Sequence, residues 1–194
     1  MKNLDLLING DVNSIYNELL KINLSPISRH ISYSDYREYL RSGAPGVEHY
    51  LLLAYISLAF SGKKIYDIGT YYGNSSIALT YNPKVHVVSY DIVDLKRVAS
   101  LPHNVEYRIG DFREDPDVLK SPFILIDVDP HDGIQEKEFH EFFLKNKYRG
   151  LVAWDDIHLP LMNPWWNSIN EPNVKKVDLT RVGHHSGTGL LIYT

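Results

Sequence analysis

Aspartates recur from residue 67 onward in this 194-residue chain, each at the end of a short apolar run or just after one. They occur in five places: Asp67, Asp91, Asp111, the pair Asp127 and Asp129, and the pair Asp155 and Asp156. One aspartate after a strand often only caps the helix that follows. Five in succession are harder to explain as caps, because parallel strands bring their carboxyl ends to one edge of a sheet. The pattern predicts a carboxylate-lined ligand site at that edge.

The first of these acids precedes a loop with two glycines, within the segment KIYDIGTYYGNSSIAL (residues 64–79). A Ser-rich stretch then begins an apolar helix. The segment therefore predicts a strand, a loop and a helix that bring a ligand against bare backbone. Gly69 and Gly73 stand four residues apart, and the dinucleotide fingerprint GxGxxG is absent. The alternative interpretation is a tight turn that needs only the backbone freedom of glycine.

Short apolar runs alternate with helical patterns from Lys64 onward, which indicates a parallel sheet covered on both faces. The expected strands are 64–68, 85–90, 105–109, 123–128 and 150–154, and the expected helices between them are 74–80, 95–100, 115–119 and 133–145. After a helix at 161–169, runs at 174–179 and 189–193 predict an antiparallel pair. The expected fold class is α/β: a Rossmann-like, doubly wound, mostly parallel seven-stranded sheet with an antiparallel last strand and N-terminal helices.

The first sixty residues have helical patterns. The expected helices are 13–21, capped by Asn13 or Ser14, then 33–41 and 47–60. We expect a single domain in which residues 1–60 form a helical cap on a Rossmann-like core of residues 61–194.

Composition excludes several classes of function. A net charge of −4 and the lack of a basic run give no electrostatic basis for nucleic-acid binding. The absence of cysteine excludes disulfides, thiolate metal sites and thiol nucleophiles, and it is typical of a reducing compartment, so we expect a cytoplasmic location. The longest apolar stretch, 50–60, is too short to span a bilayer, and the first residues do not match a signal peptide. The sequence leaves open whether the protein forms a homodimer.

The loop sequence DIGTYYGNSS resembles the first motif of the class I S-adenosylmethionine (SAM) methyltransferases, whose loop backbone approaches the amino-acid part of SAM. Asp91 follows Gly69 by 22 residues, near the spacing at which an acid binds ribose hydroxyls. Gly110-Asp111-Phe112 resembles the family's adenine-side segment, with a helix cap as the alternative role of Asp111. Glu48 lies where relatives often have an acid near the amino group of SAM, and its alternative role is an acid favoured in the first turn of a helix. The cofactor site implied by the resemblance is Glu48, Asp67, Gly69, Thr70, Tyr71, Gly73, Asn74, Ser75, Asp91, Asp111, Phe112 and Asp127.

Two later segments, FILIDVDPHDG and GLVAWDDIH, resemble a narrower group, the metal-dependent O-methyltransferases, which includes catechol O-methyltransferase and the macrocin- and sugar-type enzymes. The resemblance implies that Asp127, Asp155 and Asp156 hold a divalent cation. Three carboxylates without cysteine favour Mg²⁺, Mn²⁺ or Ca²⁺ over zinc. The alternative is a cluster of caps and surface charges, in which converging acids would repel one another.

The candidates for the catalytic base are Asp129, His131 and His158. The catechol enzymes carry a lysine three residues after the strand-four acid, where this chain has Pro130. The sugar-type enzymes carry a second acid two residues after it, which matches Asp129. Neutral imidazole is a good base near pH 7, so both histidines are alternatives, with capping or supporting roles equally open.

The region after the fifth expected strand is where enzymes of this group build a wall for the acceptor. Trp165 and Trp166 lie there, and core packing is the other interpretation. His184 and His185, in the segment GHHSGTG, either face the acceptor or belong to a simple turn.

The resemblance covers about residues 46–194. It implies a SAM-dependent, divalent-metal-dependent O-methyltransferase that uses Mg²⁺ or Mn²⁺ and acts on a hydroxyl of a sugar, a glycan or another small molecule. Three alternatives stay open. They are an NAD- or nucleotide-sugar-dependent enzyme on a similar sheet, a non-catalytic SAM-binding protein, and a metal-independent N-methyltransferase, whose Asn/Asp-Pro-Pro-Tyr motif is matched only in part by Asp129-Pro130-His131.

Overall fold

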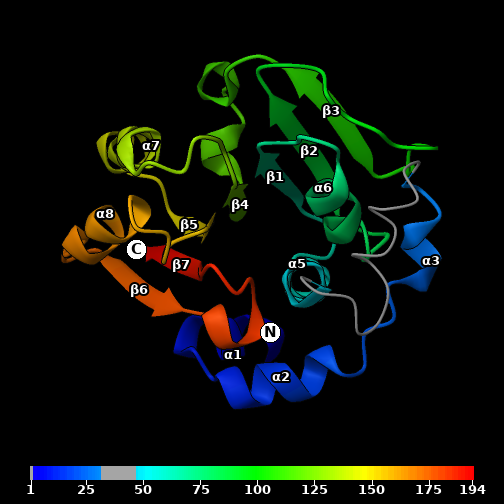
Figure 1. Ribbon diagram of the computed structural model, residues 1–194, viewed down its shortest axis with the longest axis horizontal. Coiled ribbons are helices and arrows are strands. Elements are labelled where there is room, and N and C mark those ends of the chain that lie inside the picture. The colour runs from blue at the N-terminus through cyan, green and yellow to red at the C-terminus, as the bar shows by residue number, and fades with distance from the viewer. Residues whose placement is uncertain (1, 32–46) are drawn as a thin grey trace.

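A seven-stranded mixed sheet forms the centre of the computed structural model, which describes residues 2–31 and 47–194 (Figure 1). Its strand order is β3-β2-β1-β4-β5-β7-β6. Strands β1 to β5 pair in parallel, and β7 runs antiparallel to both of its neighbours. The strands are β1 (Lys64–Ile68), β2 (His86–Asp91), β3 (Val105–Ile109), β4 (Phe123–Ile126), β5 (Gly150–Asp155), β6 (Val174–Asp178) and β7 (Thr188–Tyr193). The expected fold class is confirmed.

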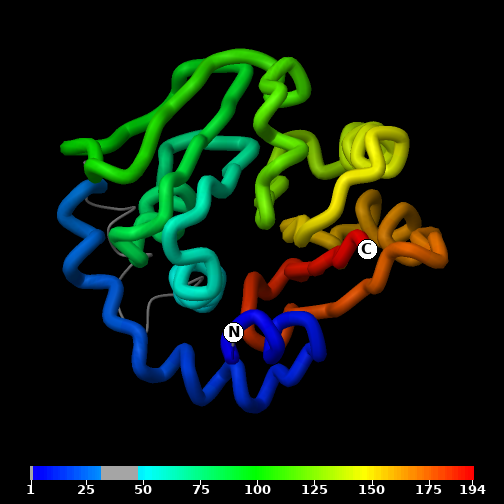
Figure 2. The backbone as a smooth tube through the Cα atoms, turned by 180° about the vertical axis from the view of Figure 1, so that it is seen from behind, coloured from blue at the N-terminus to red at the C-terminus, as the bar shows by residue number. Residues whose placement is uncertain are grey.

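The helices cover both faces of this sheet. Within the described residues, the α-helices are α1 (Lys2–Asn9), α2 (Val12–Leu19), α3 (Ser25–Ser28), α5 (Val47–Ala59), α6 (Asn74–Leu79), α7 (Ile134–Lys145) and α8 (Met162–Ser168). Short 3₁₀ turns are η1 (Phe112–Glu114), η2 (Val118–Lys120) and η3 (Thr180–Val182). Figures 1 and 2 show α5 and α6 on one side of the sheet and α7 and α8 on the other.

Two apolar cores follow from the alternation of side chains along the strands. In β1, Ile65 belongs to the core that includes residues of α1, α2, α5 and α6, whereas its neighbour Tyr66 belongs to the core that includes residues of α7 and α8. The inner strands β4 and β7 are buried along their whole length, because both faces of the sheet are covered. This burial explains why they appear in the sequence as unbroken apolar runs.

Three local predictions were wrong. Residues 95–100 form no helix, because a run this short nucleates poorly and its backbone bonds elsewhere: Ala99 N donates to His30 O at 2.7 Å. Residues 115–119 form the turn after η1 and the start of η2 rather than an α-helix. The cap of α2 is Asp11, whose side chain accepts from Ser14 N, in place of Asn13 or Ser14.

The expected helix 33–41 lies outside the described residues. Within residues 2–31 and 47–194, every helix is too short or too polar to cross a membrane.

Candidate functional site

Three adjoining cavities lie over the carboxyl ends of β1 to β5. We call them the histidine cavity (about 500 Å³), the Asp129 cavity (about 520 Å³) and the Phe112 cavity (about 450 Å³). Gly69 lines all three, so they form one continuous cleft. This cleft lies where the strand order reverses between β1 and β4, the position at which open α/β sheets bind ligands.

The residues around each cavity come from different strand ends. The histidine cavity is lined by His49, Tyr50, Gly69, Thr70, Tyr71, Tyr72, Asn74, Ser75, Asp127, Asp155, Asp156, His184 and His185. The Asp129 cavity is lined by Gly69, Tyr71, Asp91, Ile92, Val93, Leu95, Asp127, Val128, Asp129 and His131. The Phe112 cavity includes Gly69, Asp91, Ile92, Gly110, Asp111, Phe112, Arg113, Val128 and Phe139.

The loop after β1 fits tightly against the end of β4. Gly69 has a φ of +97°, and a Cβ added to it would overlap the carbonyl oxygen of Asp127. Gly73 has a φ of +95°, and a Cβ there would meet Val98 at 3.0 Å. Both positions therefore require glycine, which explains the two glycines in the motif. Gly73 precedes α6 and supports the loop without lining the three cavities.

Asp67 lies beneath this loop and is completely buried. Ser89 Oγ donates to its Oδ2 at 2.6 Å, whereas its Oδ1 has no hydrogen-bond partner among the described residues. Burial raises the pKa of Asp67 to about 6. This carboxylate thus supports the loop from below rather than lining the cleft.

Asp91 ends β2 and faces both the Asp129 cavity and the Phe112 cavity. Its Oδ2 accepts from Tyr71 N at 2.8 Å and its Oδ1 from Val93 N at 3.2 Å. Each oxygen keeps a further lone pair for a ligand hydroxyl.

Asp111 and Phe112 lie at the far end of the cleft. The Arg113 side chain donates to both oxygens of Asp111, at 2.9 and 2.6 Å, and these bonds lower the pKa of the carboxyl. Asp111 also accepts from Arg113 N at 2.9 Å, so it caps η1 as the alternative interpretation expected. Phe112 is buried and packs edge-to-face on Phe139, with ring centroids 4.9 Å apart. The Phe112 cavity therefore has an aromatic wall and a charged rim.

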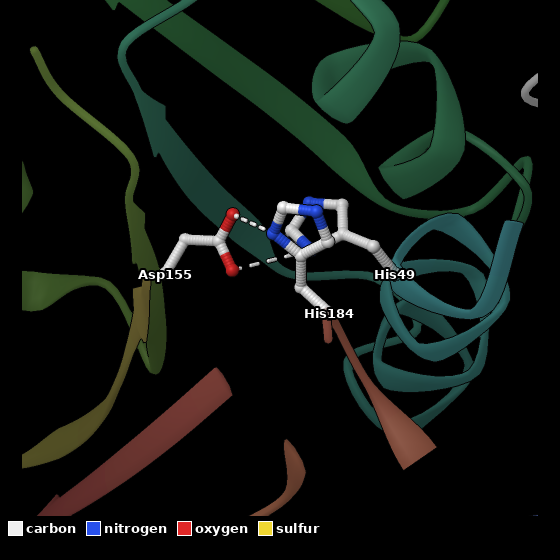
Figure 3. A group of neighbouring side chains, drawn as sticks. All are labelled: His49, Asp155 and His184. Atoms are coloured by element: carbon white, nitrogen blue, oxygen red, sulfur yellow. Dashed lines mark ion pairs between the residues drawn. The ribbon is translucent and has the colours of Figure 1, made fainter. Parts of the chain in front are cut away.

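The other end of the cleft holds three carboxylates and three imidazoles. Asp155 Oδ1 lies 3.5 Å from His49 Nδ1, and its Oδ2 lies 3.2 Å from His184 Nδ1 (Figure 3). Asp156 contacts His184 Nδ1 at 3.4 Å and, through its other oxygen, His131 Nδ1 at 3.4 Å. Two groups have all their donor atoms within 4.8 Å of one another: His49 with Asp155 and His184, and Asp127 with His131 and Asp156.

The charges in this cluster shift each other's protonation. Burial raises the pKa of Asp127 well above its usual value, and the charges of Asp155 and Asp156 raise it further. The contacts with Asp155 and Asp156 raise the pKa of His184 to about 10. Burial lowers the pKa of His49. The carboxylates of this cluster thus repel one another, and the neighbouring imidazoles offset part of that repulsion.

The backbone is unusual at the same place. Tyr71, His131 and Asp156 have φ angles of 43°, 53° and 59°, in the left-handed region that residues with side chains rarely adopt. Among the described residues, Lys147 is the one other non-glycine with a positive φ. Such strain typically gathers at functional sites, where the surrounding structure holds it in place.

Some residues considered in the sequence lie elsewhere. His158 lies outside these three cavities, and its Nε2 is 2.9 Å from Asp178 Oδ2. Glu48 is exposed on the first turn of α5, and its role stays a prediction. Trp165 and Trp166 are buried in the apolar core on the side of the sheet that α7 and α8 cover, so core packing is the correct interpretation.

Sequence reasoning missed His49. It lies on α5, one position after Glu48, and is 5% exposed at the wall of the histidine cavity. The available signal was an imidazole on a helix whose other residues are almost all apolar. His184, left open between an acceptor contact and a turn, lines the same cavity.

The fold resembles solved methyltransferase structures. An O-methyltransferase from Bacillus cereus in complex with SAH has a TM-score of 0.54 and 20% identity, covering 93% of this chain and 91% of that one. TomG from Streptomyces achromogenes, an O-methyltransferase of tomaymycin synthesis in complex with SAM, has a TM-score of 0.54 and 18% identity, covering 89% of each chain. A Klebsiella pneumoniae protein, provisionally assigned as an O-methyltransferase, has a TM-score of 0.59 and 17% identity, covering 93% of this chain and 96% of that one.

No protein-family model and no curated protein matches the sequence. Because these sequence identities are low, the similarity to the solved structures shows a shared fold. The chain has the Rossmann-like fold of the class I SAM-dependent methyltransferases.

Proposed function

We propose that this chain is a SAM-dependent O-methyltransferase that requires a divalent cation and methylates a hydroxyl of a sugar, a glycan or another small molecule. The observation that carries the proposal is the order of groups along one cleft. An aromatic pocket, a strand-end carboxylate, a glycine loop and an acid cluster follow each other from Phe112 to Asp155. The SAH- and SAM-bound O-methyltransferases with the same fold support this interpretation.

The cofactor would lie along this order. Phe112 offers an apolar surface for the adenine, and Asp91 has lone pairs left for the two ribose hydroxyls. Asn74 lines the histidine cavity, and its buried Oδ1 has no partner among the described residues. An unsatisfied buried oxygen typically costs about 1–3 kcal/mol, so a donor on the ligand is favoured there. The ammonium group of SAM is such a donor. Thr70, Tyr71 and Ser75 complete this end of the cofactor site.

The cation would be held by Asp127, Asp155 and Asp156. All three line the histidine cavity, and the raised pKa of Asp127 reflects burial and repulsion that a cation would relieve. Oxygen donors from carboxylates suit Mg²⁺ or Mn²⁺. When bound, the cation would lower the pKa of an acceptor hydroxyl.

The proton acceptor in this proposal is the pair Asp129 and His131. His131 Nε2 lies 3.3 Å from Asp129 Oδ1, and its Nδ1 faces Asp156. The Asp129 side chain is 86% exposed at the cavity mouth, so it can turn toward an incoming acceptor. The carboxylate of Asp129 orients the imidazole, and together they take the proton as the methyl group arrives.

The acceptor would enter through the Asp129 cavity. Its mouth carries exposed apolar side chains, among them Tyr71 and Ile92, beside the polar group of Asp129. Such a surface fits an acceptor with one apolar face and one hydroxyl. Because the tryptophans are in the core, the preference for a sugar is supported by the spacing of Asp127 and Asp129 and by the Tyr71 ring.

A methyl-transfer assay with SAM, a panel of sugars and phenols, and Mg²⁺ or Mn²⁺ tests this function. Asp155→Ala should remove turnover while SAH binding persists, because Asp155 lies at the cation end of the cleft. Asp117→Ala is the matched control, since Asp117 lies 3.1 Å from Lys64, which begins β1 at the end of the strand away from the cleft. Full activity of the wild type in excess chelator would contradict the metal requirement.

A further inference from the structure

We infer that His49, Asp155 and His184 form a mixed nitrogen and oxygen site for a borderline divalent cation of the zinc class, which shares Asp155 with the proposed carboxylate site of Asp127 and Asp156. The inference rests on the proposed function, because it assigns a second cation to the same cleft. Two imidazoles and one carboxylate are donors that zinc, cobalt and ferrous iron bind well and that Mg²⁺ does not favour.

The geometry is close to what such an ion needs. The two Asp155 oxygens lie 3.5 and 3.2 Å from His49 Nδ1 and His184 Nδ1, on the two imidazoles drawn in Figure 3. A tetrahedral zinc ion with bonds of about 2.0–2.2 Å holds its ligand atoms roughly 3.3–3.6 Å apart. The donor atoms of the three residues all lie within 4.8 Å of one another, so the side chains must draw together to close around one ion. Three protein ligands leave a coordination position toward the histidine cavity, as in catalytic rather than structural zinc sites.

His49 provides the second, independent observation. Its side chain is more than nine-tenths buried, and its Nδ1 has no hydrogen-bond partner among the described residues. The 3.5 Å separation from Asp155 does not satisfy that nitrogen. A buried polar atom without a partner is rare in native structures and calls for an explanation such as a bound ion. An ion between His49 and Asp155 satisfies the nitrogen directly.

Neighbouring groups hold the ligands in place. Thr188 Oγ1 donates to Asp155 Oδ1 at 3.4 Å and accepts from His184 N at 2.8 Å. It thus joins the end of β5 to the turn before β7. A Cβ added to Gly183 would meet both Thr188 and Leu52 of α5, so the turn packs closely on the helix that carries His49. Such outer contacts orient ligands in established metal sites.

The competing explanation is an ion-pair cluster without a metal. His184 would then be an imidazolium between Asp155 and Asp156, with Ser186 Oγ 2.7 Å from its Nδ1. This arrangement explains His184 but leaves the nitrogen of His49 unsatisfied. The two explanations differ in what the protein does when a metal is offered.

Titration of the metal-free full chain with Co²⁺, as a spectroscopic substitute for zinc, tests the site. We expect one Co²⁺ to bind with the intense visible absorption of a low-coordinate nitrogen-containing site, and excess Mg²⁺ not to remove it. His49→Gln and His184→Gln should each weaken Co²⁺ binding about tenfold or more. His86→Gln is the matched control, because His86 begins β2, at the end of the strand away from the cleft. Variants that bind SAH as the wild type does are folded.

Weak Co²⁺ absorption, ready displacement by Mg²⁺, or equal Co²⁺ affinity in the His49, His184 and His86 variants would overturn the inference and favour the ion-pair cluster. SAH binding, measured without added metal, is read separately. Failure of SAH binding in the wild type overturns the proposed function, whereas failure of the Co²⁺ titration alone overturns only the second cation site.

Discussion

Asp67 provides a quantitative test of how the strand-end acids are held. It is the residue before Ile68 at the end of β1, and its side chain is completely buried under the glycine loop. We predict that Asp67→Asn stabilises the protein at neutral and alkaline pH and gains nothing comparable in acid. The reason is that burial raises the pKa of the native carboxyl from 3.8 to about 6.

The size of the effect follows from linkage. The native carboxyl binds its proton more tightly than the unfolded one, so its contribution to stability is fully present below about pH 3.8 and is lost as the pH rises through about 6. At neutral pH the ionised side chain lowers the free energy of unfolding by about 3 kcal/mol relative to the protonated one. Between pH 4.5 and pH 8 the change is about 2 kcal/mol, or about 4–8 °C in Tm for a chain of this size.

Urea denaturation of wild type and Asp67→Asn at pH 4.5 and pH 8 measures this change. The difference between the two pH values cancels any effect of the amide that does not depend on pH, including an altered bond with Ser89. Asp5→Asn, on the exposed surface of α1, is the matched control and should show no such change. A free-energy difference that is the same at both pH values, or that favours the wild type at pH 8, would refute the reasoning.

Two further predictions concern the loop and the sheet below it. Gly69→Ala should weaken SAH binding at least about tenfold, because its Cβ would overlap the Asp127 carbonyl oxygen. Gly62→Ala controls for the backbone strain alone, because Gly62 has a φ of +76° and open space around it. Equal SAH affinity of the two variants would contradict the prediction. Asp115→Asn should lower the free energy of unfolding by about 2 kcal/mol, because this buried carboxylate accepts from Arg108 at 2.7 Å. Thermal melts measure the change, and an unchanged Tm would show that the ion pair contributes little.

Local sequence pattern was sufficient for most of the fold. The strand Val105–Ile109 and the helix that starts after Gly133 agree with expectation, because period and turn residues act within a few positions. The segment 95–100 was wrong, since its backbone bonds to His30, nearly seventy residues earlier in the chain. Pairings at that range are not encoded in a local pattern.

The candidate site divides in the same way. Acids that end parallel strands, such as Asp91 and Asp155, were found because topology brings those ends together. His49 was missed because its role depends on how α5 packs over β5, and the Trp165 side chain was open between two roles because burial follows from the same kind of packing. The residues that sequence could not assign are those whose neighbours come from distant elements.

The most direct test of the central claim is calorimetric titration of the wild-type chain with SAH, with and without Mg²⁺ or Mn²⁺, followed by the same titration with NAD. The account predicts micromolar binding of SAH and none of NAD, with Asp91→Ala weakening SAH binding because that carboxylate faces the cleft between its two ends. Absence of SAH binding under every metal condition, or binding of NAD in its place, would contradict it.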